Sequence, residues 1–235
     1  MTTNGRLYLS APVNAIVEGI YEEHVPFSEI RRHGDFGLGT FDLLDGEMVM
    51  LDGRIYQMTA DGCVQEVGDD ATTPFACVTF YRPEKTFDLD GELSHDDFLR
   101  RLQESLPSPN IFYAFRITGE FAHMKVRSVP KSECYIPLVE IAKEQPVFEF
   151  ENISGTLAGF YTPEFMASVS VPGMHLHFLS DDLAHGGHLL SCRPRHVSAG
   201  VQALHTVELA LPTTSYYLEW DFRRDVARDL EKAEK

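Results

Sequence analysis

Residues 175–188 read HLHFLSDDLAHGGH, a pattern that predicts a β-hairpin with a metal site on one face. Successive side chains of a strand alternate between faces, so His175 and His177 point the same way while the apolar residues around them fill a core. If the polar, glycine-rich segment that follows reverses the chain, His188 on the returning strand comes alongside them. Three neutral imidazoles leave coordination positions open for water or substrate, which is typical of catalytic metal sites.

The third ligand has an alternative within the same segment. His185 lies in the predicted turn and could replace His188 as a ligand, or it could simply sit on the turn. We favour His188, because Gly186 and Gly187 precede it and let the backbone turn tightly into the strand. Unrelated histidines would explain any one of these residues, but an HxH pair with a third histidine in one hairpin favours metal binding.

The composition is that of a globular protein, with 43% hydrophobic and 24% charged residues in a chain of 235. The excess of 36 acidic over 20 basic residues gives a net charge of −16, which repels nucleic acid phosphates and anionic membrane surfaces. No apolar run is long enough to span a bilayer, and the first residues lack the blocks of a secretory signal. We therefore expect a cytoplasmic protein that binds neither nucleic acid nor a membrane.

The cysteines support the same compartment. Cys63, Cys77, Cys134 and Cys192 are scattered along the chain and include no CxxC pair. Neither a disulfide framework nor a thiolate zinc site is indicated, and we expect the four side chains to be reduced.

The N-terminal third predicts one helix followed by short strands. A cap and a proline at residues 10–12 precede apolar residues at helical spacing from 13 to 21, which predicts an amphipathic helix. From residue 36 to about 81, short apolar segments are broken by Asp-Gly turn signals at 45–46, 52–53 and 61–62. This regularity predicts an antiparallel meander.

A second helix and two further strands are predicted next. Ser94 and Asp97 form a capping box for a helix that ends before Pro107. Two strand-like runs, at 111–117 and 121–127, then flank a tight link of three residues that contains a glycine.

Pro130 and Lys131 mark an expected seam between two lobes. Residues 1–130 would form an N-terminal lobe on a mixed β-sheet, and residues 131–235 an antiparallel β lobe that carries the metal ligands. The expected fold class is α+β and rich in β-structure, with two lobes on mixed or antiparallel sheets and a few flanking helices. Beyond the seam we expect a short helix at 138–144 and strands at 147–150, 155–161, 174–179, 188–191 and 204–211.

Seven segments in a fixed order carry a family resemblance. They are GDFGLGTF at 34–41, DGE at 45–47, YQ at 56–57, TPFA at 73–76, RSVP at 127–130, QPVF at 145–148 and the histidine segment. In this order the chain resembles the acetolactate decarboxylases, from about residue 15 to the C-terminus.

The resemblance implies that a metal, usually zinc, binds His175, His177 and His188. It also implies conversion of (S)-2-acetolactate to (R)-acetoin and CO2, a homodimer, and a C-terminal tail that reaches over the active site. Loss of CO2 from a β-keto acid leaves an electron pair that must be stored as an enediolate. A divalent metal chelated by the ketone and hydroxyl oxygens would act as the electron sink, and other divalent metals could replace zinc.

Three further residues match the family's catalytic positions. Arg127 matches the arginine that orients the substrate carboxylate. Glu47 matches a glutamate that transfers a proton to the enediolate. Alignment of the tail places a second family glutamate at Glu234, with Glu231 as the alternative.

Two other functions are compatible with the histidine pattern. A non-catalytic module of the same fold could keep the metal site and bind a small molecule without turnover. A cupin-type oxygenase shares HxH on a strand but expects a glutamate a few residues downstream as a fourth ligand, where this chain has Asp181 and Asp182. The ordered set of segments favours the decarboxylase.

Overall fold

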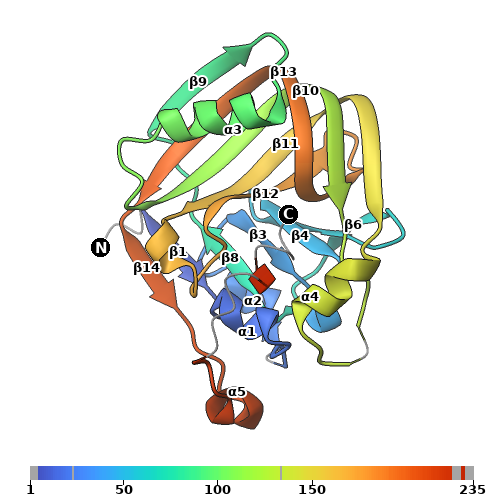
Figure 1. Ribbon diagram of the computed structural model, residues 1–235, viewed down its shortest axis with the longest axis vertical. Coiled ribbons are helices and arrows are strands. Elements are labelled where there is room, and N and C mark those ends of the chain that lie inside the picture. Colours follow the sequence, from blue (N-terminus) through green and yellow to red (C-terminus); the bar gives the residue numbers. More distant parts are fainter. Residues whose placement is uncertain (1–4, 23, 133, 224–228, 231–235) are drawn as a thin grey trace.

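The computed structural model describes residues 5–22, 24–132, 134–223 and 229–230, and in these residues β-structure predominates (Figure 1). One sheet has seven strands in the order β14-β1-β8-β3-β4-β5-β6 and is antiparallel except where β14 pairs parallel with β1. Its strands are β1 (Arg6–Leu9), β3 (Phe36–Thr40), β4 (Glu47–Leu51), β5 (Arg54–Met58), β6 (Val64–Val67), β8 (Ala76–Thr79) and β14 (Thr206–Leu209). The expected α+β fold with mixed and antiparallel sheets is confirmed.

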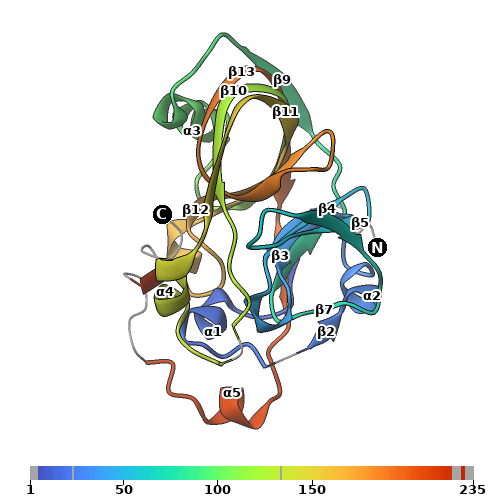
Figure 2. The ribbon, with the colours of Figure 1, turned by 90° about the vertical axis from the view of Figure 1, so that its right-hand side faces the viewer.

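The second sheet has the order β10-β11-β12-β13-β9 and is antiparallel. Because β10 also pairs with β13, strands β10 to β13 close into a barrel, which Figure 2 shows nearly end on. The strands are β9 (Lys85–Asp90), β10 (Phe112–Arg127), β11 (Val147–Thr162), β12 (Gly173–Ser180) and β13 (Gly186–Leu204).

Helices are few and short in the residues that the structure describes. The expected helix start at Ser94 is confirmed, since the Ser94 hydroxyl accepts a hydrogen bond from the Asp97 amide and begins the longest described helix. None of the described helices is both long and apolar enough to cross a membrane. The helices are α1 (Val13–Val17), α2 (Phe27–Ile30), α3 (His95–Glu104), α4 (Leu138–Ile141), α5 (Ser215–Glu219) and the 3₁₀ turns η1 (Asp42–Leu44), η2 (Ala142–Glu144) and η3 (Glu164–Met166); a small sheet pairs β2 (Val25–Pro26) with β7 (Thr72–Thr73).

The tight link expected at residues 118–120 is absent, because β10 runs through it without interruption. Gly119 sits in the middle of this strand with φ +151°, and a Cβ there would lie 2.1 Å from the carbonyl oxygen of His196. The glycine therefore permits a close approach between two long strands rather than a turn. Similarly, the two strands expected between residues 147 and 161 are one strand, β11.

The expected lobe boundary at residue 130 does not coincide with the division between the sheets. Strands β9 and β10 precede this boundary but pair with strands that follow it. Conversely, β14 follows the boundary but extends the sheet that contains β1. Strand pairing is decided by long-range register, which a change of composition along the chain does not report.

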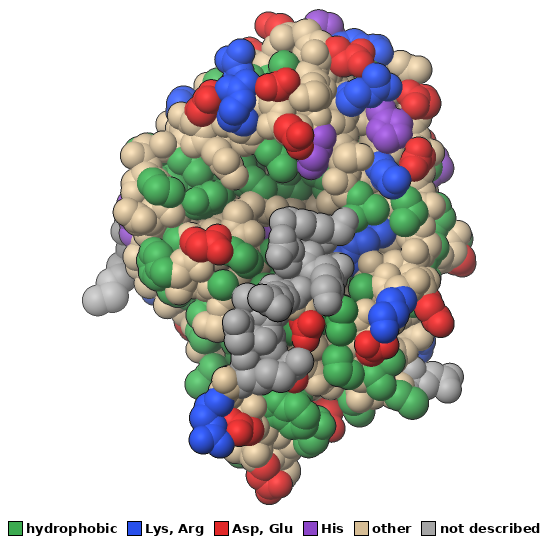
Figure 3. Space-filling view, viewed as in Figure 1, with side chains coloured by type: hydrophobic (Ala, Val, Ile, Leu, Met, Phe, Trp, Pro, Cys, Tyr) green, Lys and Arg blue, Asp and Glu red, His purple; other side chains and the backbone are tan. Residues whose placement is uncertain are grey.

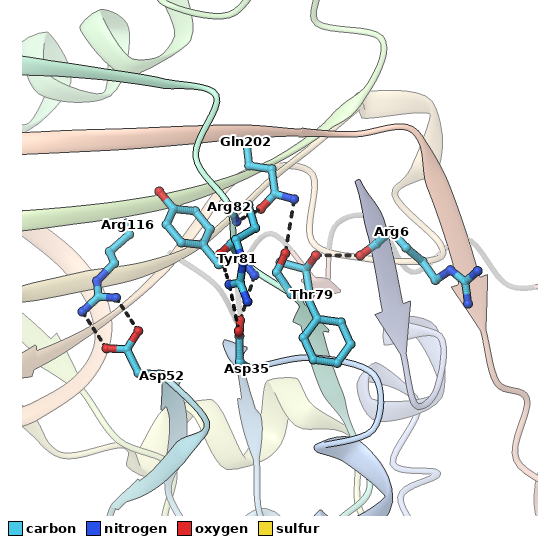
Figure 4. Close-up of polar contacts among 9 residues, drawn as sticks. Arg6, Asp35, Asp52, Thr79, Tyr81, Arg82, Arg116 and Gln202 are labelled. Atoms are coloured by element: carbon cyan, nitrogen blue, oxygen red, sulfur yellow. Dashed lines mark hydrogen bonds and ion pairs between the residues drawn. The ribbon is translucent and has the colours of Figure 1, made fainter. Parts of the chain in front are cut away.

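The two sheets share one apolar core and a set of polar contacts along their seam. Buried side chains of the seven-stranded sheet, such as Phe36, cluster with barrel residues such as Phe160. Where the two sheets meet, both guanidinium Nη atoms of Arg116 in the barrel donate to the Asp52 carboxylate, at 2.9 and 3.1 Å (Figure 4). The barrel's Gln202 accepts from the amide of Arg82, at 2.7 Å. These contacts hold the sheet with Glu47 against the barrel with the histidines.

Candidate functional site

The expected β-hairpin is formed by β12 and β13, and it brings the three histidines together. His177 lies directly opposite His188 in the register, and His175 projects from the same face of β12. One nitrogen from each ring lies within 4.8 Å of the others, and all three side chains are buried. Together with the barrel closure, the hairpin therefore builds a three-nitrogen cluster inside the molecule.

The protonation states of His175 and His177 suit metal binding. Burial, assisted by the positive charge of Arg127, lowers the pKa of His175 to about 3, and burial likewise lowers the pKa of His177 well below its ordinary value. His177 Nδ1 lies 2.9 Å from the carbonyl oxygen of Met48 and must donate to it, because a carbonyl only accepts. The lone pair of His177 is therefore on Nε2, the nitrogen that faces the other rings.

The spacing of one pair of nitrogens matches that of two ligands on a divalent metal. Two ligands of a tetrahedral metal at about 2.0–2.1 Å lie roughly 3.3–3.4 Å apart. His177 Nε2 and His188 Nδ1 are 3.3 Å apart. The ligand atoms of all three rings lie within 4.8 Å of one another, and three imidazole nitrogens are a donor set that zinc accepts.

A strained turn presents Glu47 to this cluster from the opposite sheet. Leu43 and Leu44 both adopt positive φ angles, 57° and 56°, which residues other than glycine rarely adopt. The following Gly46 has φ +86°, and its amide donates to the carbonyl of Val129 at 3.0 Å. Glu47 then starts β4 with its Oε2 atom 3.5 Å from His177 Nε2.

Arg127 reaches the same point from the end of β10. In the barrel register it lies opposite His188 on one side and Val147 on the other. Its Nη1 atom is 3.9 Å from Glu47 Oε1 and donates a 2.6 Å hydrogen bond to Gln145 Oε1. Arg127 and Glu47 are each only 5% exposed, so both groups act in a nearly water-free environment.

A small pocket of about 50 Å³ connects these groups. Its polar wall consists of Glu47, Arg127 and the three histidines. An apolar wall of the same pocket includes Val13 and Ile16 of α1. The amphipathic helix expected over 13–21 ends at Val17, and its apolar residues pack on the site, which periodicity alone did not indicate. The remaining lining residues are Gly39, Thr40, Leu44, Phe75, Val129, Leu138 and Val171.

Residues 7–224 match the family described as Alpha-acetolactate decarboxylase. This chain belongs to the alpha-acetolactate decarboxylase family.

Several members of the alpha-acetolactate decarboxylase family are similar to this chain over most of its length. The Alpha-acetolactate decarboxylase of Methanosarcina mazei is 40% identical over 230 residues, which are 97% of this chain and 80% of that protein. The Bacillus subtilis protein of the same name is 35% identical over 97% of this chain and 91% of its own length. The crystal structure of the decarboxylase from Bacillus subtilis strain 168 superposes with a TM-score of 0.94 at 34% identity, covering 97% of this chain and 99% of that one.

The sequence left two alternatives open, one for the third histidine and one for the tail glutamate. His185 lies on the turn with its ring against Phe150, at 4.4 Å between ring centroids, and it does not belong to the histidine cluster. Glu234 and its alternative Glu231 lie outside the described residues.

Gln145 is the site residue that inspection of the sequence did not assign. It belongs to the QPVF segment at 145–148, which contributed to the family resemblance without a role. Its contact with Arg127 depends on the pairing of β10 with β11, so no local signal reports it.

Proposed function

We propose that this protein catalyses the decarboxylation of (S)-2-acetolactate to (R)-acetoin and CO2 with a divalent metal, Zn²⁺ in the first place, at His175, His177 and His188. The observation that carries the proposal is the convergence of three buried histidines, a buried arginine and a buried glutamate on one small pocket. A metal bound there would supply a Lewis acid that polarises the ketone oxygen and stores the electron pair left by CO2.

In this proposal Arg127 binds and orients the substrate carboxylate. A guanidinium matches the planar carboxylate with parallel hydrogen bonds, and burial strengthens the attraction. The apolar wall contributed by α1 would accept the methyl groups and exclude water from the carbon that loses CO2.

Glu47 is proposed to hold the proton that the product carbon receives. Its carboxyl group lies between the guanidinium of Arg127 and the ring of His177, so it borders both the departing CO2 and the metal site. The C-terminal tail is proposed to contribute a second carboxyl group, Glu234 or alternatively Glu231, as a donor or relay.

We further propose a cytoplasmic homodimer. The four cysteines are thiols with no disulfide between them, which suits a reducing compartment. Hydrophobic side chains gather over α5 at the lower end of the face in Figure 3, where Leu218 and Tyr216 are exposed. An exposed apolar surface on an otherwise acidic protein suits contact with a second copy, which light scattering on the purified protein would test.

The deciding experiment measures CO2 and acetoin release from 2-acetolactate before metal removal, after chelation and after zinc return. A reaction without protein corrects for spontaneous decarboxylation. We expect activity that disappears on chelation and returns with zinc. A folded protein that binds zinc but leaves acetolactate unchanged would refute the decarboxylase proposal and favour the non-catalytic binding module.

A further inference from the structure

We propose that Ser128 is a positioning residue that fixes Glu47, on the seven-stranded sheet, relative to Arg127, on the barrel. This inference rests on the proposed roles of Glu47 in proton transfer and of Arg127 in carboxylate binding. It goes beyond them because it names the contact that sets their relative placement. Ser128 is not among the described residues that line the pocket, so it acts through its neighbours rather than on the substrate.

Ser128 joins the barrel to the seven-stranded sheet. It is fully buried and directly follows Arg127, the last residue of β10. On the barrel side, its amide donates a 3.2 Å hydrogen bond to the carbonyl of Pro146. On the other side, its hydroxyl lies 2.6 Å from the carbonyl oxygen of Met58 and must donate to it, because a carbonyl only accepts. Met58 is the last residue of β5, so the two hydrogen bonds of Ser128 connect the two sheets.

The acceptor of this hydroxyl lies beside the proposed proton donor. Met58 pairs with Glu47 in the register of β4 and β5. Arg127 and Glu47 are therefore connected by one peptide bond, one side-chain hydrogen bond and one pair of neighbouring strands. At the end of this path, Arg127 Nη1 and Glu47 Oε1 are 3.9 Å apart.

Two backbone hydrogen bonds strengthen the same junction. The amide of Gly46 donates to the carbonyl of Val129 at 3.0 Å, and the amide of Ser132 donates to the carbonyl of Leu43 at 2.8 Å. Both bonds belong to the main chain and persist when a side chain is changed. The hydroxyl of Ser128 is therefore the contact of this junction that a substitution can remove.

The loss of this hydroxyl should affect proton transfer more than substrate binding. Arg127 lies opposite His188 in the barrel register, so the carboxylate-binding group and the metal ligands are placed by the same set of strands. Glu47 alone of these groups comes from the other sheet. A weakened junction would therefore displace the proton donor from a binding site that stays intact, and a displacement of about 1 Å can cost about 10² in rate.

The experiment measures kcat, KM and zinc content of the zinc-loaded protein with 2-acetolactate. For Ser128→Ala we expect kcat to fall by about 10- to 100-fold, with KM changed less than about twofold and the zinc content unchanged. In a protein that already carries Glu47→Gln, the same change should lower kcat by less than about twofold more. The reason is that the group positioned by Ser128 is then no longer a proton donor.

Thr79→Val is the matched control. Thr79 is also fully buried, and its hydroxyl donates to the carbonyl of Arg6, likewise at 2.6 Å (Figure 4). This bond lies within the seven-stranded sheet and does not cross to the barrel. Its loss should leave both kcat and KM within about twofold of the unmodified protein.

Three results would overturn the inference. One is an unchanged kcat in Ser128→Ala, and another is an equal loss of kcat with and without Glu47→Gln. The third is a fall in kcat accompanied by lost zinc or a raised KM, which would identify a merely structural residue. If Ser128→Ala does not fold, Ser128→Cys decides, because it keeps nearly the same size but donates weakly. A kcat equal to that of the unmodified protein would then refute the role of the hydroxyl.

Crystal structures separate this inference from the proposed function. If the unmodified protein leaves acetolactate unchanged, or if Glu47→Gln turns over normally, the proposed function or the role of Glu47 fails. The placement is still tested, because Ser128→Ala should lengthen the distance between Arg127 Nη1 and Glu47 Oε1 by about 1 Å while the three histidines stay in place. An unchanged distance would overturn the role of Ser128.

Discussion

The two sides of the pocket are built in opposite ways. On the barrel side, the three histidines come from one hairpin of fourteen residues, 175–188. Side chains alternate between the two faces of a strand, so the three rings lie on the same face and close together. On the sheet side, Glu47 follows a turn in which two leucines hold positive φ angles. The metal side is therefore local and regular, whereas the carboxylate side depends on strain that the surrounding packing supports.

The largest effect is expected on the histidine side of the pocket. His177→Ala should abolish stable zinc binding and lower kcat by more than about a thousandfold, because the remaining two histidines no longer complete the ligand set. Metal analysis and acetoin release on the same sample check this outcome. Substitution of the turn residue, His185→Ala, serves as the control and should retain the metal, since its ring packs on Phe150.

A smaller effect is expected on the carboxylate side. Glu47→Gln should lower kcat by about 10²- to 10⁴-fold, the usual contribution of a positioned acid or base, while the zinc content stays unchanged. Kinetics and metal analysis of the same preparation would separate the two sides of the pocket. Unchanged turnover in Glu47→Gln would refute the proposed role in proton transfer.

Acid should weaken the folding of the metal-free barrel side. Burial holds the pKa of His175 at about 3 in the folded state, against an ordinary value of 6.5. Between these values the unfolded chain binds a proton that the folded chain does not, so the free energy of unfolding falls as the pH falls. The contribution of His175 is about 1.4 kcal/mol per pH unit.

Urea unfolding of the zinc-free protein between pH about 7 and about 5 measures this slope. His175→Gln should give a shallower slope than the unmodified protein. Equal slopes would show that His175 is not held neutral by burial.

The smallest effect is expected in the strained turn that precedes Glu47. Gly46→Ala should lower the free energy of unfolding by about 1–3 kcal/mol, because φ is +86° and the new Cβ would lie 2.3 Å from the carbonyl oxygen of Met58. Gly91→Ala is the matched control, since Gly91 has φ +84° but no atom within 4 Å of its Cβ position. The difference between the two variants in thermal unfolding isolates the close approach, and Gly46→Ala alone should also reduce kcat.

Local patterns predicted much of the chain. The β-rich class, the capped helix at Ser94 and the metal hairpin all depend on residues close together in the sequence. The Asp52-Gly53 turn also formed as expected, with both residues at positive φ between β4 and β5. In each case a short stretch contains both the residues and the geometry they impose.

The predictions from the sequence were wrong where pairing between distant segments decides the structure. The link expected at Gly119 is a continuous strand because β11 and β13 pair on either side of it. Likewise, the boundary expected at residue 130 is crossed by strands that find partners more than fifty residues away, such as β10 and β13. Turn residues signal a possible break, but pairing on both sides overrides it.

By itself, therefore, the sequence determined the ligand hairpin, the fold class and membership of the family. Only the tertiary structure decided that Glu47 and Arg127 meet at the histidines and that Gln145 contacts Arg127, since their positions depend on the closure of the barrel and its packing against the other sheet. The physical reason is that alternation and turn chemistry act over a few residues, whereas the approach of two buried polar side chains depends on long-range register and a shared core.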